Sequence, residues 1–302
     1  MRNTLVIAVV GATAAGKSEL GVRLALALGG EVVNADSMQL YLGMDVGTAK
    51  LTPAERRGAP HHLLDIWDVR GSASVAEYQR AGRSVVDRLL AGGRTPILVG
   101  GSGLYVRAVL DGLDFPGTDP RLRARLEAEL ARLGAPAMHA RLRDLDPAAA
   151  ASILPSNGRR IVRALEVIEL SGRPFSATLP AYESVYDAVQ VGLTVPQPEL
   201  DDRIARRVCS MWRDGFVDEV RRLERAGLRE GRTASRALGY AQVLRFLAGE
   251  WTEEQARDAT IRATRRFARR QLSWFRRDPR IRWLPYDAPD LLDRALQAIE
   301  TE

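Results

Sequence analysis

The sequence has 302 residues, of which 46% are hydrophobic and 27% charged, a composition typical of a folded globular protein. It holds no apolar run of membrane-spanning length and no signal-peptide layout, and its single cysteine excludes an internal disulfide framework. We therefore expect a cytoplasmic protein that contacts no membrane. The net charge of +6 and the isoelectric point of about 9.9 suit a polyanionic partner.

The first part of the chain alternates between apolar runs and amphipathic segments. Residues 5–10 are a continuous apolar run, which predicts a buried parallel strand, and residues 18–28 place leucines on one face of a helix. Further strands are predicted at 31–35 and 96–100, and further helices at 77–90 and from about 103. This alternation indicates an α/β fold with a doubly wound parallel sheet.

The pattern changes from about residue 114, where the sequence becomes rich in arginine, alanine and leucine and is interrupted by prolines. We expect a helical insertion domain at 114–180 and a catalytic core made of 1–113 and 181–302. In the second part of that core, the pattern predicts a strand at 189–195 and helices at roughly 200–226, 235–248 and 252–277. Thr252 and Gln255 form a capping-box pattern at the start of the last helix, and Cys209 is expected to be partly buried.

The most specific motif lies between the first predicted strand and the first helix and matches G-x-x-x-x-G-K-[ST]. Its glycines let backbone N–H groups converge on phosphate oxygens, and the helix N-terminus adds partial positive charge. Lys17 supplies a full charge, and the hydroxyl of Ser18 is the predicted Mg²⁺ ligand. The predicted phosphate-binding residues are Gly11, Ala12, Thr13, Ala14, Ala15, Gly16, Lys17 and Ser18.

Two further groups follow strand ends, where side chains of a parallel sheet share one crevice. In Asp36-Ser37-Met38-Gln39, the carboxylate can hold a metal or take a proton, and the glutamine amide can pair with a base; an ordinary turn is the alternative. Residues 100–105, Gly-Gly-Ser-Gly-Leu-Tyr, predict a second anion-binding turn with the Ser102 hydroxyl directed at phosphates; a packing turn is the alternative.

Arginine is concentrated in the last long predicted helix and in residues 158–163. This density suits a sugar-phosphate backbone that is bound without base readout, although a solvated helix face has a similar pattern. Candidates for such contacts are Arg159, Arg160, Arg163, Arg265 and Arg269.

Taken together, these motifs resemble those of the tRNA dimethylallyltransferase family, also called tRNA isopentenyltransferases. The resemblance covers nearly the whole chain in order. Besides the phosphate loop it includes NADSMQLYLGMDVGTAK at 34–50, PHHLLDI at 60–66, GGSGLY at 100–105, RRIVRALEVIELSGRP at 159–174, RIARRV at 203–208, ALGYAQ at 237–242 and TRRFARRQLSWFRRD at 264–278.

The resemblance implies transfer of a dimethylallyl group from dimethylallyl diphosphate to N6 of the adenosine 3′ of the anticodon, position 37, in tRNAs that read U-initial codons. The phosphate loop then holds the diphosphate with Mg²⁺, and the adenine is flipped out of the stacked loop. Asp36 resembles the general base, Ser102 the residue that hydrogen-bonds the leaving diphosphate, and Arg207 its clamp. Ser37 and Gln39 are implied to help hold the adenine, and the tRNA-binding residues of this segment are Asp36, Ser37, Met38 and Gln39.

The resemblance also implies that the helical insertion and the arginine-rich C-terminal region grip the anticodon stem-loop. Nothing in the sequence requires more than a monomer.

Two other interpretations share some of these features. A P-loop kinase of a small metabolite or nucleoside has the same loop, but its arginines are expected in a short lid. A non-catalytic RNA-binding protein with a nucleotide-gated fold explains the arginines, but gives Asp36 and Ser102 no purpose in one crevice.

Overall fold

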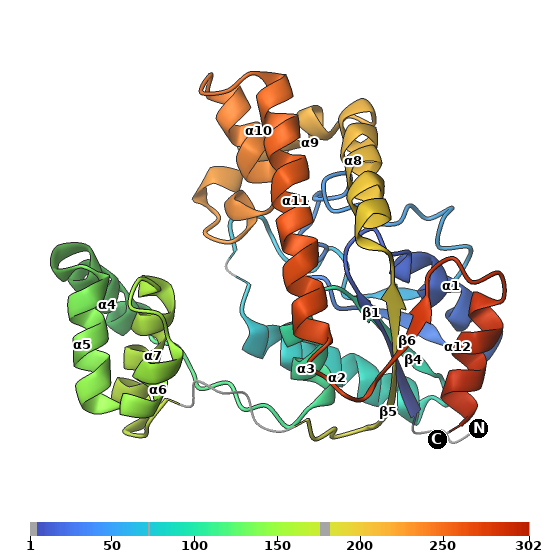
Figure 1. Ribbon diagram of the computed structural model, residues 1–302, viewed down its shortest axis with the longest axis horizontal. Coiled ribbons are helices and arrows are strands. Elements are labelled where there is room, and N and C mark those ends of the chain that lie inside the picture. Colours follow the sequence, from blue (N-terminus) through green and yellow to red (C-terminus); the bar gives the residue numbers. More distant parts are fainter. Residues whose placement is uncertain (1–4, 72, 176–181, 302) are drawn as a thin grey trace. The chain divides into compact units, whose positions relative to one another are not determined.

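The computed structural model describes residues 5–71, 73–175 and 182–301 (Figure 1). The chain divides into two compact units. The core unit comprises the described residues up to Asp111 and those from Ser184 onward, and the helical unit comprises Gly112–Glu183. The predicted insertion at 114–180 falls within the helical unit.

The described part of the core unit contains a six-stranded sheet with the order β3-β2-β4-β1-β5-β6, in which every neighbouring pair is parallel. The predicted α/β fold with a doubly wound parallel sheet is therefore confirmed. The strands at 61–62 and 281–285 were not predicted, because the first has only two residues and the second is too short to show a clear apolar pattern. The strands are β1 (Leu5–Gly11), β2 (Glu31–Asn34), β3 (His61–His62), β4 (Pro96–Gly100), β5 (Asp187–Thr194) and β6 (Ile281–Pro285).

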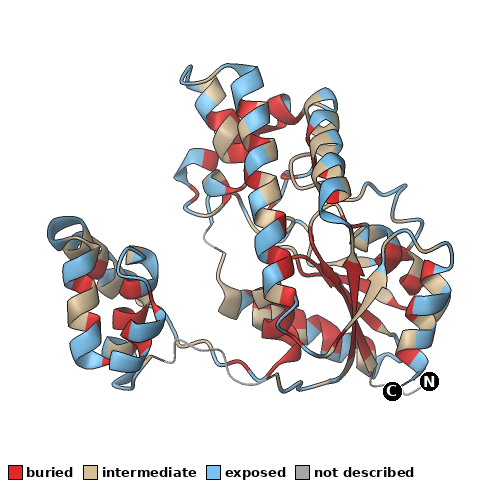
Figure 2. Cartoon of the chain, viewed as in Figure 1, coloured by how far each residue is buried: buried red, intermediate tan, exposed pale blue. Residues whose placement is uncertain are grey.

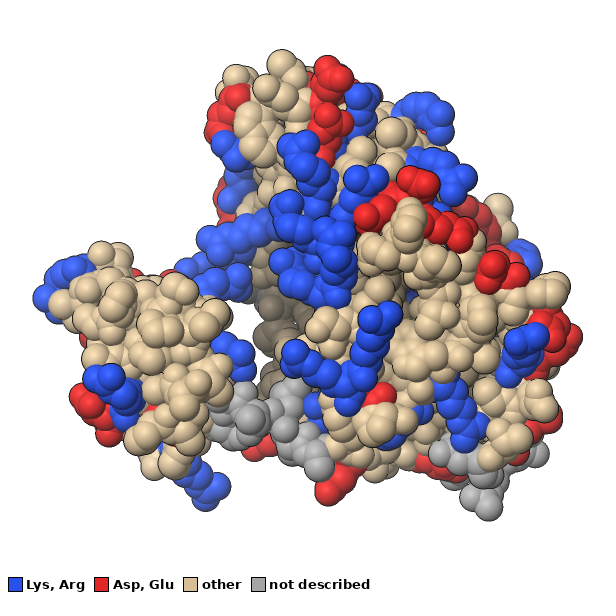
Figure 3. All heavy atoms as spheres, viewed as in Figure 1, with Lys and Arg blue, Asp and Glu red and all other residues tan. Residues whose placement is uncertain are grey.

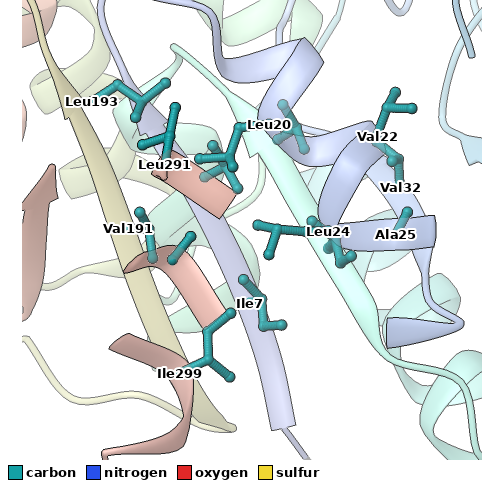
Figure 4. Close-up of a cluster of buried hydrophobic side chains, with 14 of the residues drawn as sticks. Ile7, Leu20, Val22, Leu24, Ala25, Val32, Val191, Leu193, Leu291 and Ile299 are labelled. Carbon is teal, nitrogen blue, oxygen red and sulfur yellow. The ribbon is translucent and has the colours of Figure 1, made fainter. Parts of the chain in front are cut away.

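Helices cover both faces of this sheet. This is expected because the chain adds strands on both sides of β1, and right-handed crossover connections then place helices on opposite faces. On one face, α1 (Lys17–Leu28) and α12 (Leu291–Glu300) pack over β1 and β5. Figure 4 shows their apolar side chains meeting those of the strands in one buried cluster. On the other side lie α2 (Val75–Ala91) and α3 (Gly103–Leu110) (Figure 1). The four central strands, β2, β4, β1 and β5, are buried over most of their length (Figure 2), as expected for strands covered on both faces, whereas the edge strands β3 and β6 are mostly half-buried.

The C-terminal part of the core unit consists of α8 (Gln197–Arg213), α9 (Phe216–Arg225), two short 3₁₀ helices (Leu228–Glu230 and Ala234–Arg236), α10 (Tyr240–Leu247) and α11 (Glu253–Phe275). The helix predicted at 200–226 is two helices, because Gly215 adopts a left-handed conformation with φ of 90°. The capping box of Thr252 and Gln255 is confirmed. Cys209 is exposed, not partly buried as expected, since the buried face of α8 runs through Leu200, Ile204 and Val208.

The helical unit has a separate small core. It is built from α4 (Pro120–Leu133), α5 (Ala135–Leu145), α6 (Pro147–Ser152) and α7 (Gly158–Ser171). A fully buried carboxylate, Glu166, lies among its apolar residues and pairs with Arg123 and Arg163. In neither unit does a described helix have the length and apolarity needed to cross a membrane.

Candidate active site

The phosphate loop connects β1 to α1, and its backbone has the conformations that its sequence predicts. Gly11 and Gly16 have positive φ angles of 136° and 98°, which favour glycine, and Gly16 caps the helix. Ala14 also lies in the left-handed region, with φ of 63°. The side chain of Arg203 stabilises this unusual turn, because its Nε donates to the Ala14 carbonyl oxygen at 2.8 Å.

Lys17 is the first residue of α1, and its side chain reaches back to the loop. Its ammonium donates to the Ala12 carbonyl oxygen at 2.6 Å. Burial lowers the pKa of Lys17 to about 8; the nearby carboxylate of Asp36 opposes this change, and the guanidinium of Arg207 adds to it. The loop is therefore a cationic site that is poorly solvated and short of negative charge.

Arg207 lies one turn after Arg203 on α8, so both side chains reach the same loop. Its guanidinium donates to Thr13 Oγ1 at 3.3 Å and to the Thr48 carbonyl oxygen at 3.4 Å. Burial lowers the pKa of Arg207, and Asp36 opposes that change. The helix thus adds a second, partly buried cation beside Lys17.

Asp36 stands in a turn that follows β2. The buried side chain of Asn34 accepts from the Asp36 N–H at 2.9 Å and donates to the carbonyl oxygens of Asp36 and Leu63, both at 3.0 Å. One carboxylate oxygen of Asp36 accepts from the Met38 N–H at 2.9 Å. The backbone therefore fixes the direction of the carboxylate.

The loop after β4 brings Ser102 to the Asp36 turn. Its hydroxyl oxygen accepts from the Ser37 N–H at 3.3 Å and lies 3.4 Å from Ser37 Oγ. The glycines on either side of Ser102 have a packing role. A Cβ on Gly101 would lie 2.2 Å from Gln271, and one on Gly103 would lie 2.1 Å from the Trp274 ring, so both glycines allow α11 to pack closely. This supports the packing alternative for the glycines.

A buried carboxylate holds the loop that faces this turn. Glu219 of α9 accepts from the N–H groups of Asp45, Val46 and Gly47 at 2.7–3.1 Å and from the Tyr240 hydroxyl at 2.6 Å. A second anchor follows in the same loop. Lys50 is buried, and its ammonium bonds to the carboxylates of Asp45 and Asp65, each at 2.6 Å. Neither anchor was predicted, because no local sequence pattern points to it beyond the rarity of lysine.

Two of the cavities beside these residues contain Asp36 in their lining. The smaller, of about 80 Å³, is polar and is lined by Lys17, Ser18, Asp36, Gln39 and Arg207, among others. The larger, of about 350 Å³, adjoins Thr13, Ala14, Asp36, Ser37, Met38, Ser102 and Arg207 and has apolar walls from α8, α9 and α10. The structure therefore brings together the phosphate loop, Asp36, Ser102 and Arg207, as predicted residues of one site.

Gln39 and some of the predicted RNA-binding arginines form hydrogen bonds within the protein, and the other arginines are exposed. The Gln39 amide nitrogen donates to the carbonyl oxygens of Thr48 and Ala49 in the smaller cavity. In the helical unit, Arg163 bonds to Glu166 and to two carbonyl oxygens, Arg159 is exposed, and Arg160 is also exposed. In the core unit, Arg265 donates to the Asp201 carbonyl oxygen.

Arg269 lies 3.7 Å from the Asp201 carboxylate. Lysine and arginine side chains gather over α11 (Figure 3), with Arg262, Arg266, Arg269 and Arg270 exposed on that helix. These residues belong to the arginine-rich helix that the sequence indicated, and the basic surface extends beyond the candidates Arg265 and Arg269.

The fold and site define a class: an α/β protein whose phosphate loop opens into a cavity with a carboxylate and apolar walls. Residues 39–278 match the model of the IPP transferase family, and the chain belongs to that family. It is 70% identical over 299 residues to the tRNA dimethylallyltransferase of Thermobifida fusca, covering 97% of this chain and 94% of the relative. The corresponding protein of Streptomyces avermitilis is 71% identical over 288 residues, covering 95% and 92%.

Solved structures agree with this assignment. A full-length tRNA isopentenylpyrophosphate transferase from Bacillus halodurans superposes with a TM-score of 0.72 at 41% identity, covering 97% of this chain and 94% of that chain. A eukaryotic dimethylallyltransferase captured acting on tRNA has the same fold, with a TM-score of 0.83 at 24% identity and coverage of 98% and 78%. Membership of this family of transferases does not favour the kinase alternative.

Proposed function

We propose that this enzyme transfers a dimethylallyl group from dimethylallyl diphosphate to N6 of the adenosine at position 37 of tRNAs that read U-initial codons, releasing diphosphate. The observation that carries the proposal is the single site in which the phosphate loop, Asp36, Ser102 and Arg207 surround cavities of opposite character. The polar cavity suits a diphosphate, and the larger one, with apolar walls, suits an isoprenoid chain and a flat base.

The transfer breaks the bond between C1 of the allyl group and the diphosphate oxygen, and it forms a bond from C1 to N6 of adenine. Lys17 and Arg207 neutralise the charge that develops on the departing diphosphate, and the Ser102 hydroxyl donates to it. Both cations are partly buried, so their interaction with that charge is screened less than it is in water.

The amine loses a proton as the new bond forms, and Asp36 is the base that accepts it. The Met38 N–H holds one carboxylate oxygen, and Asp36 lines both cavities, so the carboxylate lies where the two substrates meet. Ser37 and Met38 line the larger cavity and contact the adenine, while Gln39 shapes the loop beside it.

Mg²⁺ fits this site as an ion held mainly by the diphosphate. Ser18 is a hydroxyl ligand beside the phosphate loop, and Asp36 shares the polar cavity with it. Among the described residues, no three histidine, cysteine, aspartate or glutamate side chains form a metal cluster. Mg²⁺ commonly keeps several waters and binds through substrate phosphates in such sites, where it neutralises phosphate charge.

We propose that tRNA is bound by basic side chains of α11 and by the exposed arginines of the helical unit, through the anticodon stem-loop. We also propose that the enzyme acts as a monomer in the cytoplasm. Phosphate contacts of this kind position the RNA, and the cavity selects the everted base.

A transfer assay tests the proposal directly. Purified protein is incubated with Mg²⁺, labelled dimethylallyl diphosphate and unmodified tRNA, and the label is located in the RNA after nuclease digestion. Label at N6 of adenosine 37 is the expected result. A tRNA with guanosine at position 37 is the matched control, and label in that control or no label in either RNA contradicts the proposal.

A further inference from the structure

Gln271 of α11 lies between the phosphate loop and the Ser102 loop. Its side-chain oxygen accepts from the Thr13 N–H at 2.9 Å, and its side-chain nitrogen donates to the Gly101 carbonyl oxygen at 2.8 Å. The residue is 5% exposed. One carboxamide therefore satisfies two backbone groups that are far from it in the sequence.

This contact lies where the sheet opens. β1 and β4 are paired as far as Val10 and Gly100; β4 ends there, and β1 ends one residue later at Gly11. Beyond this point the two segments no longer bond to each other directly. The Gln271 carboxamide bridges them instead, and its size sets the distance between the phosphate loop and the Ser102 loop. It also lines the polar cavity with Lys17 and Arg207.

The Ser102 loop is fitted to this helix on both sides. Gly101 has no room for a Cβ because of Gln271, and Gly103 has none because of Trp274, which follows one turn later on α11. Ser102 stands between these two contacts, so the position of α11 determines the position of its hydroxyl.

We propose that Gln271 is a positioning residue for the transfer: it sets the separation between the phosphate loop, which holds the diphosphate, and Ser102, which hydrogen-bonds it as it leaves. This inference rests on the proposed function. Without the carboxamide, the Thr13 N–H and the Gly101 carbonyl lose their partners, and the two loops are free to shift against the leaving group. Displacements of about 1 Å in such a site slow catalysis substantially.

The first test replaces the carboxamide by an apolar side chain of similar length. We expect Gln271→Met to lower the single-turnover rate at saturating substrates by about tenfold or more, while the dissociation constant for tRNA stays unchanged. The matched control is Gln190→Met, because Gln190 is also a buried glutamine, 2% exposed, and bonds to Asp278 away from the site. A rate for Gln271→Met no lower than that of the control overturns the proposal.

A double-mutant cycle separates positioning from general loss of stability. If Gln271 acts by placing Ser102, then Gln271→Met should slow the Ser102→Ala enzyme by less than about threefold, because the group that it positions is already missing. A purely structural role slows both backgrounds by the same factor, and that outcome contradicts the proposal.

Gln271→Glu keeps the test decisive if the methionine variant does not fold. Its ionised carboxylate can still accept from Thr13 but cannot donate to Gly101, whereas the protonated carboxyl group can do both. We expect its rate, relative to that of the unsubstituted enzyme, to rise as the pH falls. A constant ratio across pH overturns the proposal, and absence of transfer by the unsubstituted enzyme instead contradicts the proposed function.

Discussion

The ammonium group of Lys17 donates to the carbonyl oxygen of Ala12 at 2.6 Å, so the lysine is folded back onto its own phosphate loop. Because it is buried there, its pKa falls from 10.5 to about 8. A bound diphosphate brings negative charge to the ammonium and raises that pKa again. Binding of the diphosphate is therefore linked to proton uptake at alkaline pH.

This linkage predicts that affinity for inorganic diphosphate falls as the pH rises above about 8, where the free enzyme loses the lysine proton. Calorimetric titrations between about pH 6.5 and 9.5 measure the effect. Lys17→Met is the control and should bind weakly, with a much flatter pH profile. An equally steep profile in that variant assigns the effect to another group.

The stability of the ligand-free enzyme should rise with pH over the range in which its affinity for diphosphate falls. A lysine whose pKa is lowered by folding destabilises the folded state below that pKa, and the cost disappears as the pH rises from about 8 to 10.5. Without ligand, Lys17→Met should therefore be more stable than the unsubstituted enzyme at pH 7, with a smaller difference at pH 10. Denaturant titrations at the two pH values measure this change.

Asp36→Asn should slow the chemical step by roughly 100-fold or more, since general base catalysis is typically worth 10²–10⁴-fold. The amide keeps an oxygen for the Met38 N–H, so tRNA affinity should remain. Asp68→Asn is a matched control, because Asp68 accepts in the same way from the Arg70 N–H at 2.9 Å but is exposed. Single-turnover rates decide the matter, and equal rates for the two variants exclude Asp36 as the base.

Arg207→Ala should raise the Michaelis constant for dimethylallyl diphosphate about tenfold or more and slow transfer as well, because a partly buried cation beside the leaving group is lost. Arg213→Ala, in the exposed last turn of the same helix, is the control and should behave like the unsubstituted enzyme. Steady-state kinetics with varied diphosphate measure both constants. An unchanged Michaelis constant and rate for Arg207→Ala count against the clamp.

The phosphate loop and the strand-end position of Asp36 were predictable because each depends on a short local pattern. The partners of these residues were not, since Gln271 meets Thr13 across 258 residues and Glu219 meets Gly47 across 172. The glycines of the Ser102 loop show the same limit, because their purpose depends on side chains of α11. Local sequence thus indicated the reacting groups, whereas the groups that hold them come from tertiary packing.

Glu219 illustrates such a supporting residue, and its removal should be costly. Glu219→Gln replaces one acceptor oxygen by an amide NH₂ group, which cannot accept from the backbone N–H donors that face it. We therefore expect a loss of about 2–3 kcal/mol in the free energy of unfolding. Glu224→Gln, on the same helix, breaks only a surface pair with Arg229 and should cost less than about 1 kcal/mol. Urea titrations measure both, and similar losses contradict the assignment.

Two arginines of α7 should respond differently to substitution. Arg163 bonds to the fully buried Glu166, so Arg163→Ala should destabilise the protein by about 1–3 kcal/mol, which thermal or urea unfolding measures. Arg123 also bonds to Glu166, which limits the loss.

Arg159, by contrast, is exposed in the first turn of that helix, so Arg159→Ala should leave stability unchanged. If Arg159 contacts an RNA phosphate, the substitution should weaken tRNA binding and reduce the slope of log affinity against log salt by about one contact. Filter binding between about 50 and 200 mM salt measures both quantities. An unchanged affinity and slope would remove Arg159 from the RNA-binding surface, because a solvated side chain with no phosphate partner releases no counterion when tRNA binds.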